Sequence, residues 1–557
     1  MKNKLALLGL VILAASSIVA CGGVSSTSSA KPTTSITPTT NKPTSTTNNY
    51  SEKGIFFSSK ASSEGNGSLE QPYSSLDKLS SLSLEPGSYI YLEVDSLFYG
   101  SLKLTNVHGS EKKPIVITSY GKGNKPKIDG NNLVGGAVVH LENCSNIVVQ
   151  NLEIYDSATT EDDRRGVLVE VNNPEEKEEL VTYENIKLNN LYVHDILGFR
   201  DAENSGMGMF SKKTGGIHLW SSDGFGRSKN FEISNCKITN VSNVGIATWY
   251  KMEGETVSKV SPYSNDFKSY AHLETHIHHN EINYIGKNAI FLRHLYEGVV
   301  EYNVIHDTSI HCVSGNTIVT SYVHGTIIQY NEGYRNMAKP RESDGKIQDG
   351  CMLDADLQSR DTIWQYNYSH DNSFGLFLNC TSYNEDSGIK DRAIVRYNLS
   401  VNDLGKKGIV YINYVSDGIY VYNNTIVTGK ETEYIIQSND KRTSFFYNNL
   451  IYNRSQKASF SFTDTSGLVA EYNLVYNEEG ASIKNSDLFK KVNANGVYKN
   501  PIFQGFLQED SELGIDNLFT FQLEYNSPAL NVGKEVDAKE DFFGNPYKKS
   551  IGFYCGG

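Results

Sequence analysis

The chain is short of cysteine and lacks the cysteine patterns that hold metal ions. Seven cysteines occur in 557 residues, and they show neither CxxC nor any other metal-ligand spacing. Disulfides can form outside the cell, but a chain of this length does not depend on them to fold. We therefore expect mostly buried thiols.

An excess of positive charge is missing as well. The sequence has 51 Lys and Arg residues against 64 Asp and Glu residues, which gives a formal net charge of -13. Binding to a polyanion depends on a surplus of Lys and Arg on the surface. We therefore expect no nucleic-acid partner and no polyanion-binding surface.

The apolar stretch at the start is too short for an ordinary membrane span. Residues 5–20 are apolar and follow Lys2 and Lys4, an order typical of an export signal that is removed from the mature protein. Residues 22–50 are almost entirely Ser, Thr, Pro, Asn, Gly and Lys. Such a segment cannot bury enough surface to fold, so we interpret it as a tether.

The end of this signal resembles the cleavage box of bacterial lipoproteins. Ile18, Val19 and Ala20 precede Cys21, and the resemblance implies cleavage before Cys21 and lipidation of that cysteine. A plain secretory signal is the alternative. The predicted organisation is a signal at 1–20, a tether at 21–50 and a folded domain at 51–557. The protein would then be held at the cell surface by its lipid.

The folded part contains a repeat built on the dipeptide Tyr-Asn. The last four copies begin 25 residues apart, and each lies between short β-prone runs. The copies begin at residues 302, 330, 366, 397, 422, 447 and 472. Such a unit predicts one coil of an all-β, single-domain, right-handed parallel β-helix, in which the asparagines of successive turns hydrogen-bond along the stack. Regular leucines and four-stranded blades, the marks of other repeat folds, are missing; a β-sandwich is the alternative.

The two ends of the domain resemble those of secreted β-helix enzymes. We expect a cap at 51–100 with a short helix from about Ser74 to Leu82, coils over about 101–480, and a closing segment at 481–557. Gaps longer than one coil predict loops at 158–184, 196–214, 221–230, 252–275, 332–348 and 381–392. Because long loops on a rigid scaffold commonly form sites, we expect the working surface between about 190 and 390.

One strand of each coil can be aligned on its leading small residue, as in GIHLWSS, GIATWYK and GCMLDAD. The second and fourth positions are apolar in nearly every row, so the fifth and seventh positions should face outward. The fifth positions are Trp220, Trp249, Arg293, Ser321, Asp354, Asn379 and Ile412, and the seventh include Lys251 and Asp356. Aromatic rings suit stacking against sugars, and carboxylates suit acid and base chemistry on a glycosidic bond. The column predicts a saccharide groove.

Other roles for these residues stay open. The tryptophans can pack beneath loops, and Arg293 can simply neutralise the aspartates. Asp354 and Asp356 can hold a structural calcium ion, since hard oxygen ligands at alternate positions suit that ion. A solvated pair of acids with no role is the remaining alternative.

Two classes of sugar chemistry fit such a groove. A polysaccharide lyase needs a basic residue, for which Lys251, Arg293 and Lys346 are candidates, and often uses calcium. A glycoside hydrolase needs two carboxyl groups. Asp349, Asp354 and Asp356 lie within one coil, where like charges push carboxyl pKa values apart as an acid and a nucleophile require. We therefore favour hydrolysis of an extracellular oligo- or polysaccharide, with the lyase second and a non-catalytic glycan-binding protein third.

Residues 349–380 resemble the matching coil of the lacto-N-biosidase-like β-helix glycoside hydrolases. That family places two catalytic aspartates seven residues apart, a spacing that Asp349 and Asp356 share. The resemblance implies that Asp349 is the acid/base and Asp356 the nucleophile, with Asp354 tuning them or binding sugar hydroxyls. No cofactor is required, calcium stays open, and we expect a monomer.

Histidines recur beside aspartates at one turn, as in His194-Asp195, His306-Asp307 and His370-Asp371. Because the pair recurs, we expect a structural stack, while His370 also counts as a candidate substrate-binding residue beside Asn379. The HIHHN run at 276–280 lacks a carboxylate at ligand spacing, so we expect no zinc site there.

Overall fold

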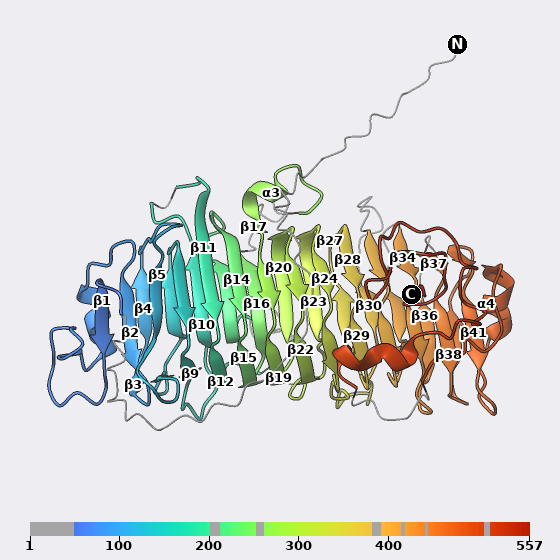
Figure 1. Cartoon of the computed structure of the whole chain (residues 1–557), viewed down its shortest axis with the longest axis horizontal. Helices are drawn as coiled ribbons and strands as arrows, with labels where there is room; N and C mark the ends of the chain where they lie inside the picture. The colour runs from blue at the N-terminus through green and yellow to red at the C-terminus, as the bar shows by residue number, and fades with distance from the viewer. Residues whose placement is uncertain are drawn as a thin grey trace, which may run out of the picture. The chain divides into compact units, whose positions relative to one another are not determined.

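Short parallel strands, stacked coil upon coil, make up the chain in this computed structural model (Figure 1). It describes residues 50–556 except 176, 201–211, 252–260, 381–391, 414–417, 440–443 and 506–512. The predicted signal, the tether up to Asn49 and Cys21 lie outside the described residues and remain predictions. Among the described residues, no helix has the length and apolar character needed to cross a membrane.

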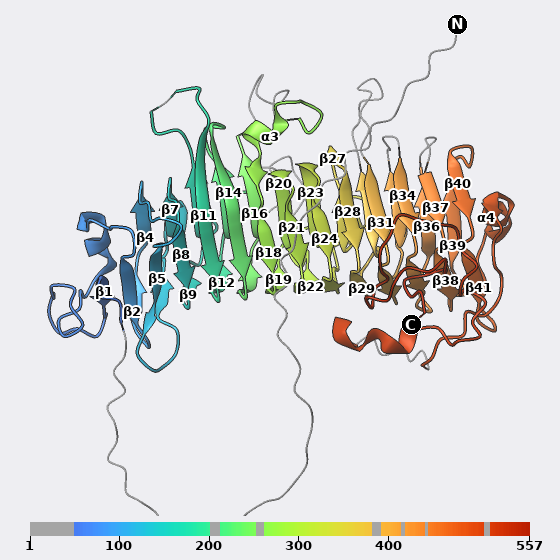
Figure 2. The same cartoon turned by 45° about the horizontal axis from the view of Figure 1, so that its top comes forward.

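Each coil contributes strands to three ladders, and the strands of every ladder pair in parallel (Figures 1 and 2). The first ladder consists of β4 (Leu102–Thr105), β7 (Gly136–Glu142), β10 (Arg164–Val171), β13 (Gly215–Ser221), β16 (Val244–Tyr250), β20 (Ile290–Tyr296), β23 (Ile318–His324), β26 (Leu353–Ala355), β30 (Phe377–Cys380), β33 (Val410–Asn413), β36 (Tyr434–Ser438) and β39 (Ser459–Phe462).

The second ladder joins the first in one 29-stranded sheet through β17 (His272–Leu273), which pairs with β14 and β20, while β27 (Ser359–Arg360) pairs with β23 of the first ladder. Its members are β1 (Gly54–Phe57), β2 (Tyr89–Glu93), β5 (Ile115–Tyr120), β8 (Ile147–Gln150), β11 (Val181–Asn189), β14 (Gly226–Ser234), β18 (His276–His278), β21 (Val299–Glu301), β24 (Ile327–Gln329), β28 (Thr362–Gln365), β31 (Ala393–Arg396), β34 (Ile419–Tyr422), β37 (Ser444–Tyr447), β40 (Leu468–Glu471) and β42 (Asn493–Ala494).

The third ladder is a separate 13-stranded sheet. It consists of β3 (Leu97–Tyr99), β6 (Lys127–Asp129), β9 (Glu153–Tyr155), β12 (Tyr192–Ile196), β15 (Lys237–Val241), β19 (Glu281–Ile285), β22 (Val304–Thr308), β25 (Glu332–Tyr334), β29 (Tyr368–His370), β32 (Leu399–Val401), β35 (Thr425–Val427), β38 (Leu450–Asn453) and β41 (Leu474–Asn477). The three ladders enclose one continuous apolar core from Phe57 to Phe489. The predicted right-handed parallel β-helix is confirmed.

A ladder of buried asparagines fixes the turn between the second and third ladders. Each side-chain amide donates to the side-chain oxygen of the next asparagine, at 2.9–3.0 Å. The members are Asn280, Asn303, Asn331, Asn367, Asn398, Asn424, Asn449, Asn473 and Asn493. The predicted stacking is confirmed, with one change: in the two Tyr-Asn-Asn coils the second asparagine joins the ladder, because the first takes up the left-handed turn position (φ 54° at Asn423, 52° at Asn448).

Four of the predicted loops contain strands: besides the two described next, residues 252–275 include β17 and residues 332–348 begin with β25. Residues 158–184 include β10, a full member of the first ladder, and residues 221–230 include the start of β14. The coil of β10 went unrecognised because it lies within residues 158–184, a gap longer than one coil that predicts a loop. The first ladder therefore extends further toward the N-terminus than the alignment predicted.

The cap and the closing segment differ in detail from the expectation. The cap helix is a 3₁₀ helix, η1 (Leu76–Ser81), which begins after the N-cap Ser75. After α4 (Ser486–Val492), the closing segment runs back along the coils through η3 (Ile515–Phe521). Its Ile515 N–H donates to Glu332 at 3.1 Å, and its Gly552 N–H donates to the carbonyl of Asn448 at 2.7 Å. It therefore covers a flank of the solenoid as well as its end.

Three further features belong to the described part of the chain. A short helix, α3 (Phe267–Tyr270), precedes β17. The described cysteines are free thiols, and all except the half-buried Cys380 are buried, in line with the expectation. Each predicted His-Asp pair is hydrogen-bonded, at 2.6–2.8 Å, and stacks on tyrosines of the third ladder. The structural role predicted for these pairs fits that arrangement.

The asparagine ladder makes a stability prediction. Asn367 donates to the carbonyls of Ile328 and Gln365 and accepts from the backbone and side chain of Asn331. Asn367→Ala leaves these buried polar groups without a hydrogen-bond partner, so we expect the free energy of unfolding to fall by about 3 kcal/mol or more. Chemical denaturation measures this, with the exposed Asn517→Ala as the control. Equal midpoints for the two variants would contradict a supporting role for the ladder.

Candidate active site

Strand register decides which side chains gather on the outer face of the first ladder. Trp220 pairs with Trp249 across β13 and β16, and Arg293 pairs with Ser321 across β20 and β23, as aligned. Asp354, however, pairs with Val319. The aspartate row is therefore displaced by two residues from its predicted place.

This displacement keeps both aspartates on the outer face. Leu353 and Ala355 belong to the core, so Asp354 points the other way, as does Asp356 by alternation. Continuing the register places Asp356 beside Ser321, and the Asp356 N–H donates to the carbonyl of Thr320 at 3.0 Å. Asp356, rather than Asp354, thus lies in the column of the tryptophans and Arg293.

The predicted outward position of Asn379 is wrong. Asn379 pairs with Ala355 and is fully buried, and its neighbour Phe377 belongs to the core. Ile412 pairs with Asn379 and also belongs to the core. A slip of one residue in the alignment reverses the face of every side chain in a strand. Asn379 therefore cannot contact a ligand on the outer face.

Asn316 joins the loop that carries Asp349 to the strand that carries Asp354. Its amide nitrogen donates to Oδ2 of Asp354 at 2.7 Å, and its oxygen accepts from the N–H groups of Gly350 and Cys351 at 2.9 and 2.8 Å. Asp349 Oδ2 in turn accepts from the Gly315 N–H at 3.0 Å. The direction of Asp349, which alternation left undecided, is set by this contact.

Burial and charge affect the carboxyl groups of Asp354 and Asp356 unequally. Burial, followed by the charges of Asp356 and Asp349, raises the pKa of Asp354 well above its ordinary value. Burial also raises the pKa of Asp356, but the charges of Lys212 and Arg293 oppose that rise. Asp354 therefore holds a proton more strongly, and Asp356 is favoured as the carboxylate.

Two cations, the half-buried Lys212 and the buried Arg293, act on the acids. Nζ of Lys212 lies 4.6 Å from the centre of the Phe291 ring, and the Arg293 guanidinium lies 4.8 Å from that of Tyr322. Burial, with the charge of Lys287 next, lowers the pKa of Lys212 to about 8, although Asp356 and Asp349 counteract it. Burial lowers the pKa of Arg293 to about 10. Both cations partly neutralise the acids.

Sequence reasoning missed Lys212 and Asn316. Lys212 lies in the predicted loop 196–214, where no period assigns a direction to a side chain. Asn316 lies just before β23, outside the Tyr-Asn repeat. The signal that could have found Asn316 is its place directly before the aligned row TIVTSYV.

The two tryptophans differ in accessibility. Trp249 is fully buried and stacks on Phe291, with ring centres 5.1 Å apart. It packs in a small apolar cluster with Val244, Ala247, Phe291 and Val319 and offers no open face. Trp220 is half-buried, with the cations of Arg165 and Lys213 at 5.6 and 5.3 Å from its ring. The role of Trp249 as an exposed sugar platform is wrong, while Trp220 remains a candidate.

The remaining candidates lie outside the acid cluster, which consists of Asp349, Asp354 and Asp356. Lys251 follows β16 and is exposed, as is Lys346 in the loop before Asp349. His370 lies on β29 of the third ladder, hydrogen-bonded to Asp371 and near Glu332. Because it belongs to a different sheet from the aspartates, the structure does not bring His370 to the groove. Among the described residues, no group of three or more His, Cys, Asp or Glu side chains is arranged to hold a metal ion.

Comparisons with known proteins agree with this architecture. No model of a known protein family matches the chain. The chain is 25% identical over 459 residues to a lacto-N-biosidase of Bifidobacterium longum subsp. longum, a match covering 69% of the chain and 27% of that protein. The chain thus spans about a quarter of the length of this curated relative.

Solved structures of the GH136 lacto-N-biosidase from Eubacterium ramulus are similar in fold. The native protein aligns with a TM-score of 0.54 and 21% identity, over 80% of this chain and 66% of that one. Its selenomethionine derivative aligns with a TM-score of 0.54 and 22% identity, over 73% and 67%. The resemblance to lacto-N-biosidase-like proteins is confirmed, and the shared right-handed parallel β-helix is the conclusion these structures support.

Asp354 makes a prediction about stability and pH. Because its pKa is raised in the folded protein, the wild type loses stability as pH rises above about 4, where the unfolded chain ionises. Asp354→Asn is neutral at every pH and escapes this loss. The free energy of unfolding of the variant minus that of the wild type should therefore grow from pH 4 toward pH 8 in denaturation experiments. A difference that stays constant over this range would contradict the buried, protonated state.

Proposed function

We propose that the chain is a glycoside hydrolase that cleaves oligosaccharides outside the cytoplasm. The observation that carries this proposal is the cluster of Asp349, Asp354 and Asp356. Burial raises the pKa of Asp354 well above its ordinary value, whereas the charges of Lys212 and Arg293 oppose the rise for Asp356. Glycoside hydrolysis requires such a division between a protonated and an ionised carboxyl group.

We assign Asp356 as the nucleophile and Asp349 as the acid/base. Lys212 and Arg293 favour the ionised form of Asp356, which attacks the anomeric carbon while the acid donates its proton to the departing oxygen. Water then releases the sugar from Asp356 and returns a proton to the acid/base. The neutral Asp354 lies near both and can donate a hydrogen bond to a sugar hydroxyl; its raised pKa also makes it the second candidate for the acid.

The similar proteins suggest the first substrates to test. They are lacto-N-biosidases, so oligosaccharides containing lacto-N-biose units head the panel. We further propose that the enzyme acts as a monomer at the cell surface, held by lipid on Cys21, and that its chemistry needs no metal or cofactor. A wider panel of neutral and acidic glycans then defines the sugar and the linkage.

A polysaccharide lyase is the second candidate, and one observation favours it. The pKa of Lys212 is lowered to about 8, which brings this amine toward the range of a base that removes a proton next to a uronate. Lyase action creates an unsaturated uronate that absorbs ultraviolet light, whereas hydrolysis creates reducing ends without that absorbance. The same digests therefore separate the two reactions.

Removing either assigned carboxylate should abolish hydrolysis. We expect Asp349→Asn and Asp356→Asn each to lower the rate by about 10³-fold or more, because each removes a reacting group. Chromatography of the released sugars measures the rate, and the exposed Asp516→Asn serves as the control.

The series also distinguishes the two acid candidates. A loss of this size for Asp354→Asn, with Asp349→Asn active, would transfer the acid role to Asp354. Unchanged cleavage by the Asp356 variant would contradict the assignment of the nucleophile, and absence of cleavage of every glycan by the wild type would favour a binding protein.

Lys212 should set the acid limb of the pH profile. Its charge lowers the pKa of Asp356, so Lys212→Met should raise that pKa and move the acid limb of kcat/KM to higher pH. Lys212→Arg keeps the charge and should leave the limb near its original position. An acid limb that Lys212→Met leaves in place would show that this cation does not act on Asp356.

A further inference from the structure

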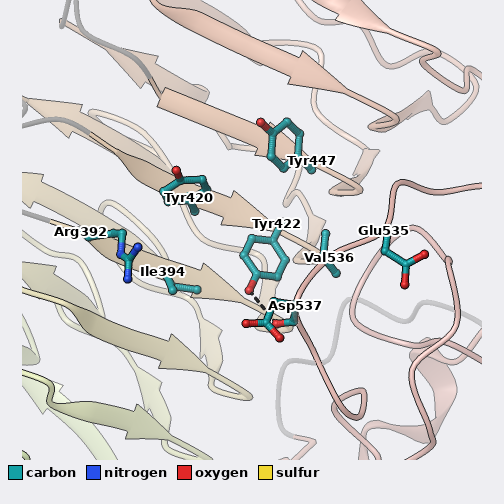
Figure 3. Close-up of a pocket in the computed structure, with 8 residues that line it drawn as sticks. All are labelled: Arg392, Ile394, Tyr420, Tyr422, Tyr447, Glu535, Val536 and Asp537. Atoms are coloured by element: carbon teal, nitrogen blue, oxygen red, sulfur yellow. Dashed lines mark hydrogen bonds between the residues drawn. The ribbon is translucent and has the colours of Figure 1, made fainter. Parts of the chain in front are cut away.

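A cavity lies on the outer face of the second ladder, away from the acid cluster on the first. Its volume is about 290 Å³, and strands β31, β34 and β37 form one side while residues 535–537 of the closing segment form the other (Figure 3). None of the catalytic candidates lines it. The function proposed above does not use this cavity.

Register gives the cavity an aromatic and apolar floor. Ile394 pairs with Tyr420, which pairs with Phe445, so the three side chains follow one another at the coil spacing of about 4.8 Å. All three are half-buried, and the rings of Tyr420 and Phe445 stack with centres 4.6 Å apart. Phe445 therefore holds the Tyr420 ring in place from behind.

The closing segment is anchored beside this floor rather than on top of it. The Arg396 guanidinium donates to the carbonyl of Asp537 and, at 3.0 Å, to the hydroxyl of Tyr422. Nζ of Lys534 lies 4.0 Å from the centre of the Tyr447 ring. These contacts keep Tyr422 and Tyr447 against the segment and leave the side of Tyr420 as the open part of the cavity.

Charges of both signs border the aromatic floor. Arg392 lies at one edge, and the exposed carboxylates of Glu535 and Asp537 lie at the other (Figure 3). Glu535 is paired with Lys549, whose Nζ lies 2.6 Å from its carboxylate oxygen. Arg392 is held by Asp361, with Nε 3.1 Å from its carboxylate oxygen. Donors and acceptors thus lie on opposite sides of a flat aromatic surface, and the balance of charge disfavours a ligand with a strong charge of either sign.

We propose that this cavity is a second, non-catalytic binding site for a neutral saccharide. A pyranose ring presents an apolar face that can stack on Tyr420, and its hydroxyls both donate and accept hydrogen bonds, as Arg392, Glu535 and Asp537 require. A uronate would gain little here, because Arg392 is already held by Asp361 and Asp537 carries a negative charge, so we expect neutral sugars to bind better than acidic ones. The site would hold a glycan on the flank of the solenoid while another part of it reaches the acid cluster.

A neighbouring cavity lets the site extend along the coils. It has a volume of about 410 Å³, lies on the other side of Arg396, and shares Asp537 with the first. Tyr330 and Tyr366 stack within it, with ring centres 4.9 Å apart. Aromatic side chains therefore continue along the same closing segment.

Binding measurements on an inactive chain test the site. In full-length Asp356→Asn, saturation-transfer NMR is used to titrate neutral tetrasaccharides of glucose, galactose, xylose or N-acetylhexosamine, with tetragalacturonate as the acidic comparison. We expect at least one neutral sugar to bind, and Tyr420→Ala added to Asp356→Asn to weaken it by about tenfold. The exposed Tyr284→Ala on the third ladder is the matched control and should leave binding unchanged.

Several outcomes would overturn the site. They are the same affinity with and without Tyr420→Ala, binding of none of the neutral sugars, or preference for tetragalacturonate. In an otherwise wild-type chain, Tyr420→Ala should leave the hydrolysis of short substrates unchanged. Failure of the catalytic assignment and failure of this site therefore give different results.

Discussion

Parallel pairing between successive coils is the constraint on which the rest of this molecule depends. Side chains alternate across a strand, so the register of one coil on the next determines which residues reach solvent. The buried asparagines hold that register at the turn, since each satisfies backbone groups of its own coil and a neighbouring one. The stacking of the coils therefore determines which side chains, distant in the sequence, lie together on one surface.

The acid cluster illustrates what the scaffold permits. Asp354 and Asp356 reach the outer face of one coil, and Asn316 of the preceding coil ties Asp354 to the loop of Asp349. Lys212 and Arg293 supply opposite charge from other segments. Rigid strands can thus keep carboxyl groups buried and close together, a costly arrangement that a flexible loop would relax. Burial raises the pKa of both groups; the charges of Asp356 and Asp349 add to the rise for Asp354, whereas those of Lys212 and Arg293 oppose it for Asp356.

Much of the fold could be predicted because each regular coil carries the same recognisable residues, a tyrosine followed by an asparagine, at the same turn. The Tyr-Asn pairs gave the coil length, and the asparagine stacking follows from their recurrence. The coil of β10 was missed because it lies within a long gap that predicts a loop. Which asparagine of a Tyr-Asn-Asn coil joins the ladder depends on the left-handed φ of Asn423 and Asn448. Local turn geometry is weakly encoded in a short motif.

The site was harder to predict, since it depends on register and on loops. Aligning rows on a small residue placed Trp220, Trp249, Arg293 and Ser321 correctly, yet displaced Asp354 by two residues and Asn379 by one. An even displacement kept the aspartates outside, whereas the odd one put Asn379 in the core. Lys212 reaches the acids from a loop, for which the strand period carries no information.

The central claim is that the outer face of β26 and the loop before it hold the sugar that is cleaved. A crystal structure of Asp356→Asn, soaked with a glycan that the wild type hydrolyses, tests this most directly. The account predicts a sugar ring within hydrogen-bond distance of Asp349 and Asp354, with its anomeric carbon facing residue 356. A glycan bound on another face, with these carboxyl groups free of sugar, would contradict it.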